Sequence, residues 1–240
     1  MATAWLEWNG TLYWACYERL PFEPRSALLC LVEGVWQYDP GMAHFILRSR
    51  IFVDYEPTAL CRGTVVVCAK RFSRVERVPV EVRQRMHEAD RAVCVGVHLQ
   101  NTPAQRLASS LEELAPYHRD RSIEAWLLGA DGRLLGCAVN SSGRNRTLHA
   151  EMNLLHFWWQ RARKPLPARA RIVTTLEPCP MCAGAIWECI EEREYFLVQY
   201  LQPDLGTVVR RSVLRGTRIL EHCKNIEQDL NPQVIESTKL

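Results

Sequence analysis

The stretch EPCPMC, residues 177–182, contains two cysteines three positions apart, at a point where a helix is expected to begin. Pro180 suits the first turn of a helix, and the apolar residues that follow predict a helix over 180–189. The start of a helix favours the thiolate form of a cysteine, because the helix dipole is positive there. Two thiolates on one side of a helix start are typical ligands of a zinc ion.

A histidine and a glutamate lie at the start of another expected helix, in the sequence His149-Ala150-Glu151. Apolar residues at helical spacing predict this helix over 148–162, ending before Pro165. His149 can supply a third zinc ligand and leave one tetrahedral position open, which is the arrangement of a catalytic zinc site. Glu151 follows two positions later, close enough to take a proton from water at the open position and to deliver it to a substrate.

Other readings of the same residues stay open. A closed, structural zinc site needs a fourth ligand. Cys189 lies about 10 Å beyond Cys182 along the helix axis, too far to share one ion, but Cys137 on a neighbouring strand remains a candidate. A thiol–disulfide oxidoreductase would use Cys179 and Cys182 without requiring His149 or Glu151.

Composition excludes several classes of protein. The chain has 240 residues, 48% of them apolar, and a net charge of +3, which excludes a disordered chain. No run of about 18 apolar residues exists, so no membrane association is expected. The first ten residues do not have the pattern of a secretory signal, and ten cysteines lie scattered through the chain, mostly within apolar runs. These features predict a cytoplasmic protein with reduced thiols.

The second half of the chain alternates predicted strands and helices. Strands are expected over 124–128 and 134–139, joined by a hairpin turn at Asp131-Gly132, and over 171–176 and 195–201. Segments 208–214 and 218–230 have patterns compatible with helices. Strands that alternate with helices predict an α/β fold.

The first half has a different pattern, rich in aromatic and β-branched residues. Its sequence predicts four strands, a helix, a strand and a second helix, over 11–17, 27–38, 44–53, 63–69, 80–89, 92–99 and 104–114. Proline and clustered charges at 115–122 predict a domain boundary there. The chain is therefore expected to consist of two domains, 1–118 and 119–240.

Residues 123–201 resemble the cytidine-deaminase-like superfamily and, over TLEPCPMCAGA at 175–185, its tRNA adenosine deaminase and guanine deaminase branch. The resemblance implies a three-layer α/β/α catalytic domain with a zinc ion held by His149, Cys179 and Cys182. It also implies Glu151 as the proton shuttle of a hydrolytic deamination and Asn140, at the end of a strand, as a residue that contacts the base.

Deaminases of this branch usually pair as dimers, so the resemblance implies either a homodimer or a pseudo-dimer within one chain. Residues 1–118 show no His-x-Glu and no Pro-Cys-x-x-Cys motif. They are expected to form a β-rich α/β accessory domain, or a degenerate deaminase-like unit that replaces the partner.

The charge distribution bears on the substrate. Segment 144–171 carries seven basic residues and one acid, and segment 206–218 carries four arginines and no acid. This pattern favours adenine or cytosine in single-stranded nucleic acid, either single-stranded DNA or a tRNA loop. A free guanine or nucleobase deaminase is the alternative, and a non-catalytic nucleic-acid-binding partner subunit is an alternative of another class. The aromatic residues 157–159 are expected to pack in the core.

Overall fold

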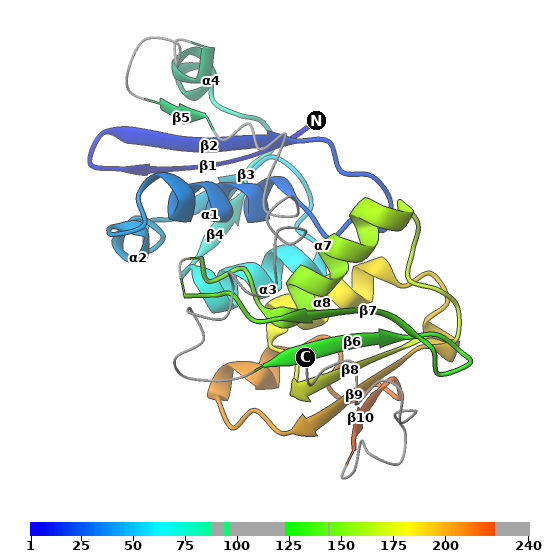
Figure 1. The fold of residues 1–240 in the computed structure, drawn as a ribbon. Helices are drawn as coiled ribbons and strands as arrows, with labels where there is room; N and C mark the ends of the chain where they lie inside the picture. The colour runs from blue at the N-terminus through cyan, green and yellow to red at the C-terminus, as the bar shows by residue number, and fades with distance from the viewer. Residues whose placement is uncertain (88–93, 97–122, 144, 224–240) are drawn as a thin grey trace.

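Two five-stranded sheets with helices between them make up the structure, a computed structural model that describes residues 1–87, 94–96, 123–143 and 145–223. In Figure 1 the sheet of the first half lies at the top and that of the second half at the bottom, with α1, α3, α7 and α8 in the layer between them. Strands and helices alternate along both halves, so the predicted α/β class is confirmed.

The second sheet closely follows the sequence prediction. The elements of this half are β6 (Glu124–Leu128), β7 (Leu134–Val139), α7 (Ala150–Ala162), β8 (Arg171–Leu176), α8 (Pro180–Cys189), β9 (Leu197–Gln202) and β10 (Leu220–His222). Their order in the sheet is β10-β9-β8-β6-β7. The strand β6 runs antiparallel to both β7 and β8, whereas β8, β9 and β10 are mutually parallel. Gly132 has a φ of 78° in the hairpin turn, as the Asp-Gly pair predicts.

Two segments near the end of this half differ from expectation. The expected helix at 208–214 is reduced to a short 3-10 helix, η4 (Thr207–Arg211), and residues 220–222 form an edge strand. Residues beyond 223 lie outside the described part of the chain.

The first sheet has the order β4-β3-β1-β2-β5. Its half of the chain contains β1 (Ala2–Trp8), β2 (Thr11–Tyr17), α1 (Ala27–Tyr38), α2 (Ala43–Ile46), β3 (Ile51–Val53), α3 (Ala59–Cys68), β4 (Phe72–Arg74), α4 (Val80–His87) and β5 (Cys94–Gly96). The predictions of β2, α4 and β5 are confirmed in place, and β1 was not foreseen. The expected helix at 104–114 and the expected boundaries at 115–122 and at 118/119 lie outside the described residues.

Two of the expected strands are helices. Segment 27–38 is α1, which begins where the hydroxyl of Ser26 accepts a hydrogen bond from the amide of Leu29 (3.1 Å). Segment 63–69 belongs mostly to α3, and the hydroxyl of Thr58 caps its first turn. Both helices are apolar on most sides because they lie between the two sheets, and a continuous apolar run does not distinguish a buried helix from a buried strand. The capping residues Ser26 and Thr58 mark the starts of these helices, and the sequence prediction did not use them.

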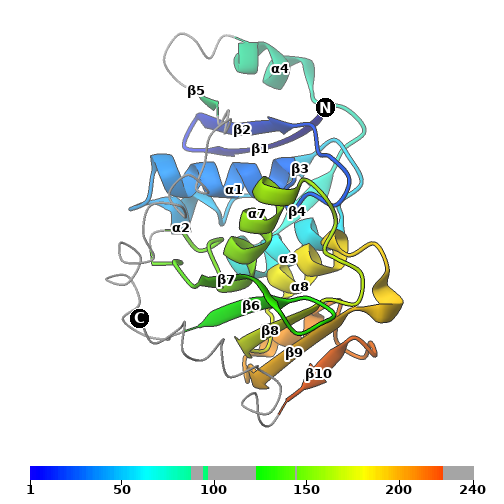
Figure 2. The same ribbon diagram turned by 45° about the vertical axis from the view of Figure 1, so that its right-hand side comes forward.

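The expected strand at 44–53 is also shorter than predicted. Residues 43–46 form the helical turn α2, and only 51–53 join the sheet as β3. Figure 2 shows the resulting arrangement from a second side, with α1 and α3 against the first sheet and α7 and α8 against the second. Within the described residues, no helix has the length and apolar character needed to cross a membrane.

Candidate metal and catalytic site

Two helix starts bring the predicted metal ligands together. His149 is the N-cap residue of α7, and Cys179 is the N-cap residue of α8, with Cys182 in the first turn of that helix. Both N-cap residues have extended backbone angles, and neither side chain caps its own helix. The imidazole and the thiol are therefore available to a ligand, beside the positive ends of two helix dipoles.

The three ligand atoms form a nearly equilateral triangle. Sγ of Cys179 lies 3.4 Å from Nδ1 of His149 and 3.5 Å from Sγ of Cys182, and the latter lies 3.5 Å from Nδ1 of His149. Ligands at usual zinc distances in a tetrahedral array are separated by roughly 3.5–3.8 Å. The side chains thus fit a zinc ion without rearrangement, and their soft sulfur and nitrogen donors suit this metal.

Glu151 completes the group. Its side chain is buried, and its Oε2 lies 3.5 Å from Sγ of Cys182. Burial raises the pKa of this carboxyl to about 7, the negative charge of Cys179 adds to the effect, and His149 opposes it. A carboxyl with a pKa near neutrality can both accept and release a proton under physiological conditions.

The ligands also polarise one another. A hydrogen bond from Cys182, together with the nearby imidazole, holds the pKa of Cys179 well below its usual range. Burial raises the pKa of Cys182. Burial lowers the pKa of His149, but the charge of Cys179 and a hydrogen bond with it outweigh that effect, and the pKa rises to about 9. The lowered pKa of the Cys179 thiol and the raised pKa of the His149 imidazole therefore support each other, and a metal would replace the protons that these ligands carry.

A fourth protein ligand is not found among the described residues. Within them, the only set of at least three ligand-type side chains that could share one metal consists of His149, Cys179 and Cys182. Cys137, the candidate for a closed site, is exposed on β7 and does not join this set. Cys189 is buried at the far end of α8 and does not join it either. A set of three described ligands is thus consistent with a catalytic zinc site, in which the fourth coordination position is open.

Asn140 lies one residue beyond β7, on the path to His149. The backbone N–H of Asn140 donates to the carbonyl of Ile123 (2.9 Å), and the backbone N–H of Ser141 donates to the carbonyl of Leu148 (2.9 Å). The side-chain oxygen of Asn140 is buried and has no hydrogen-bond partner among the described residues. An unsatisfied buried acceptor is costly unless a ligand pairs with it, so this atom is available to a donor on a bound base.

The structure adds neighbours that the sequence pattern did not single out. Sγ of Cys68, at the end of α3, lies 3.7 Å from the carbonyl oxygen of Arg146 and 4.0 Å from Sδ of Met181. Asp204, which follows β9, lies close enough to His149 for its charge to raise the pKa of the imidazole. No local motif marks either residue, because the packing of distant segments brings both to the site.

The aromatic residues 157–159 pack as the sequence predicts. Trp159 is buried, Trp158 packs against the main core cluster, and Phe157 lies against Gly136 on β7. The nitrogen of the Trp158 indole donates to the carbonyl of Pro165 (3.1 Å). These rings are used in packing.

Residues 115–225 match the family described as Bd3614-like deaminase. Among curated proteins, the tRNA(Ile)-lysidine synthase of Deinococcus radiodurans is 35% identical over 83 residues, and that of Deinococcus deserti is 32% identical over 99 residues. These matches cover 34% and 38% of this chain but only 14% and 19% of the two synthases, so the similar region is a small part of each.

Two solved structures are similar at lower identity. One comes from a study of A-to-I editing by tRNA:A34 deaminases at the wobble position of transfer RNA (24% identity, 42% of this chain and 82% of that chain, TM-score 0.32). The other is a guanine deaminase from Nitrosomonas europaea (23% identity, 43% of this chain and 60% of that chain, TM-score 0.29). The family match shows that residues 115–225 of this chain, a little under half of it, are similar to a deaminase domain.

Proposed function

We propose that this chain is a zinc-dependent hydrolytic deaminase whose substrate is adenine or cytosine in single-stranded nucleic acid. The observation that carries the proposal is the triangle formed by His149, Cys179 and Cys182, with the buried carboxyl of Glu151 3.5 Å from one sulfur. A purely structural zinc site has no use for a buried carboxyl with a pKa near neutrality beside its ligands.

The roles of the residues follow from their positions. His149, Cys179 and Cys182 would hold the zinc ion. When bound, the ion would act as a Lewis acid that lowers the pKa of water, so that hydroxide can attack an amidine carbon. Glu151 accepts a proton from the attacking water, delivers it to the ring nitrogen and assists protonation of the departing amine. A carbon–oxygen bond forms, the exocyclic carbon–nitrogen bond breaks, and ammonia leaves.

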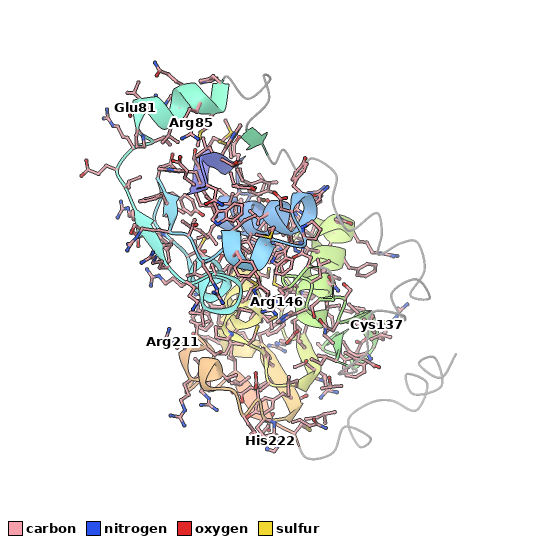
Figure 3. The ribbon with its side chains drawn as sticks, turned by 90° about the vertical axis from the view of Figure 1, so that its left-hand side faces the viewer. Glu81, Arg85, Cys137, Arg146, Arg211 and His222 are labelled. Carbon is pink, nitrogen blue, oxygen red and sulfur yellow. The ribbon has the colours of Figure 1, made fainter. Side chains whose placement is uncertain are left out.

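The exposed basic residues support a polymeric substrate near the site. Arg146 lies three residues before His149 and is exposed. Arg210 and Arg211 are exposed on η4, which begins three residues after Asp204, and Figure 3 shows Arg211 at the edge of the molecule. By contrast, Arg161 lies near the end of α7, about 18 Å along the helix from His149. Arg146, Arg210 and Arg211 are therefore the proposed phosphate contacts.

We propose a cytoplasmic location for the protein. Buried cysteines of the described residues, such as Cys30 and Cys189, are thiols that form no disulfide. Reduced thiols and a thiolate metal site are typical of a reducing compartment.

A side-by-side assay of ammonia release tests the proposed function. The zinc-loaded chain is given guanine, cytosine, adenosine, single-stranded DNA and tRNA, and turnover is expected on one of the two polymers. Turnover on free guanine alone would replace the proposed substrate by a free base. Binding of nucleic acid without turnover on any of the five would favour a non-catalytic partner subunit.

Substitution of Asn140 tests its role in base recognition. Asn140→Ala is expected to lower kcat/KM by roughly 10-fold to 100-fold, because a lost hydrogen bond to a desolvated base costs about 1–3 kcal/mol. The metal content is expected to stay unchanged, since Asn140 is not a ligand. Ser142→Ala, in the same loop, is the control and should retain wild-type kinetics. Equal kinetics for both variants would exclude Asn140 from base recognition.

Removal of the proposed phosphate contacts tests the polymer specificity. The double variant Arg210→Ala/Arg211→Ala is expected to weaken binding to single-stranded nucleic acid and to reduce the slope of log K against log salt by roughly 1. Arg161→Ala/Lys164→Ala removes equal charge at the far end of α7 and should leave the slope unchanged. Fluorescence anisotropy at several salt concentrations measures both, and identical slopes for the two double variants would contradict the assignment.

A further inference from the structure

The first half of the chain repeats the strand arrangement of the second half. The order β2-β1-β3-β4 in the first sheet corresponds to β7-β6-β8-β9 in the second. The senses also agree, because each of the first two neighbour pairs is antiparallel and the third is parallel. A helix joins the second strand to the third in both halves (α1 and α7), and another joins the third to the fourth (α3 and α8).

Once Ala4 of β1 is aligned with Ala125 of β6, the strand pairing fixes which residues of the neighbouring strands correspond. Ala4 pairs with Ala15 and Val53 in the first sheet, and Ala125 pairs with Ala138 and Thr174 in the second. Equivalent residues of β1 and β6, and of β3 and β8, are therefore separated by 121 positions.

This register reveals a sequence repeat. Ala4-Trp5-Leu6 corresponds to Ala125-Trp126-Leu127, each 121 positions apart. At the same separation, residues 56–63 (EPTALCRG) correspond to residues 177–184 (EPCPMCAG), with Glu, Pro, Cys and Gly retained. A match of fold and residues, at a separation of 121 positions for β1/β6, β3/β8 and α3/α8 and of 123 for β2/β7 and α1/α7, indicates two copies of one unit.

The first copy has lost the chemistry of the second. Ser26, the N-cap residue of α1, stands at the position of His149, the N-cap residue of α7, so Leu28 stands at the position of Glu151, here at a separation of 123 positions. Thr58 stands at the position of Cys179, and only Cys61 remains of the ligands. The hydroxyls of Ser26 and Thr58 cap their own helices instead.

A tyrosine occupies the equivalent of the ligand triangle. The hydroxyl of Tyr55 lies 3.4 Å from Sγ of Cys61 and accepts a hydrogen bond from the amide of Leu28 (3.1 Å). Burial raises the pKa of Tyr55, so its phenol stays neutral. The first copy therefore holds a neutral phenol where the second holds a metal-binding group.

The two copies meet through equivalent residues. A Cβ placed on Gly63 of α3 would lie 2.1 Å from the carbonyl oxygen of Pro180, and one placed on Gly184 of α8 would lie 2.5 Å from that of Ala59. Gly63 and Gly184 correspond, as do Ala59 and Pro180, so the contact is reciprocal. Reciprocal contacts are those of a twofold axis, here between two units of one chain.

A second contact between equivalent positions of the two copies joins two different residue types. Glu33 of α1 and His156 of α7 are each seven residues beyond the N-cap of their helix, and Oε1 of Glu33 lies 3.9 Å from Nε2 of His156. Arg25 lies 3.6 Å from the same carboxylate. Two identical copies would place an acid against an acid or a histidine against a histidine, so this pair suits two different units.

We infer that residues 2–74 are a second, degenerate deaminase unit that serves as the built-in partner of the catalytic unit, so that one chain does the work of a dimer. The partner also supports the candidate site. Cys68 of α3 contacts the carbonyl oxygen of Arg146 and the side chain of Met181, and the Trp36 ring lies 6.0 Å from the guanidinium of Arg146. These contacts hold the loop that leads to His149.

The mass and metal content of the wild-type chain test this inference. Because the α3–α8 face is already covered, light scattering is expected to give the mass of one 27.7 kDa chain from about 1 to about 100 μM. Metal analysis is expected to give one zinc per chain, lost in Cys182→Ser. A dimer in this range, or a second zinc retained in Cys182→Ser, would overturn the inference.

Two glycine variants test the packing of the two units. Gly63→Leu and Gly184→Leu are each expected to lower the Tm by roughly 5 °C or more, since the added side chain meets backbone atoms of the other unit. Gly41→Leu is the control, because Gly41 faces open space, and its Tm should match that of the wild type. Wild-type Tm values for Gly63→Leu and Gly184→Leu would contradict the contact. Failure of either variant to fold, with Gly41→Leu folding normally, would support it.

These readouts do not depend on the reaction. A monomer with one zinc that shows no deaminase activity would contradict the proposed function and leave the built-in partner standing. A dimer with deaminase activity would contradict the built-in partner and support the proposed function.

Discussion

Glu151→Gln is expected to lower kcat by roughly 10²-fold to 10⁴-fold and to leave the zinc content unchanged. General acid–base catalysis by one positioned group contributes a factor of this size. The amide keeps the shape of the side chain but cannot take a proton from water. Since Glu151 is not one of the three side chains that share the proposed metal, the ligand triangle should survive the substitution.

The pH profile gives a second readout of the same residue. Glu151 must be ionised to accept a proton, and its pKa is raised to about 7, mainly by burial. The wild-type rate should therefore rise with pH through an acidic limb near pH 7, and Glu151→Gln should lose this limb along with its activity. Glu124→Gln, a half-buried glutamate outside the ligand group, is the control and should retain both rate and profile. A Glu151→Gln variant with wild-type turnover would exclude the proton-shuttle role.

Removal of zinc is expected to abolish activity and to lower the Tm by about 10 °C. The ion would join the starts of α7 and α8, and a ligand bound only to the folded state stabilises it by about 4 kcal/mol at a thousandfold excess over its Kd. A shift of this size in free energy corresponds to about 10 °C for a chain of this length. Calorimetry with and without a chelator measures the shift, and added zinc should restore both properties.

Substitution of a ligand should reproduce the metal-free state. Cys182→Ser is expected to be inactive, and added zinc should not restore its activity. Cys189→Ala, in the same helix but outside the ligand triangle, should keep its metal. Zinc should also be lost as the pH falls, because the two sulfurs and His149 must release protons to bind it. With a pKa of about 9 in the metal-free group, His149 should release a proton when zinc binds at pH 7. An active Cys182→Ser protein without metal would contradict the hydrolytic mechanism.

The candidate site could be predicted from the sequence because its ligand-type and acidic side chains lie at the starts of two helices. His149 and Glu151 share one turn, and Cys179 and Cys182 share another, so local spacing predicted which side chains point to one place. The strands of the second half were predicted for a related reason, since turn residues such as Gly132 bound them on either side. Cys68 and Asp204 could not be found in this way, because each reaches the site only through the packing of a distant element.

The sequence by itself determined the α/β class, the candidate metal ligands and the position of the carboxyl, because each depends on residues within one or two turns. Only the tertiary structure decided that 27–38 and 59–68 are helices, and that the first half repeats the fold of the second. Both segments are mostly apolar, and a mostly apolar run by itself does not distinguish a buried helix from a buried strand. Loss of the metal ligands likewise removed the motif from the first copy, and the correspondence survived only in strand order, pairing register and the reciprocal contact of two glycines.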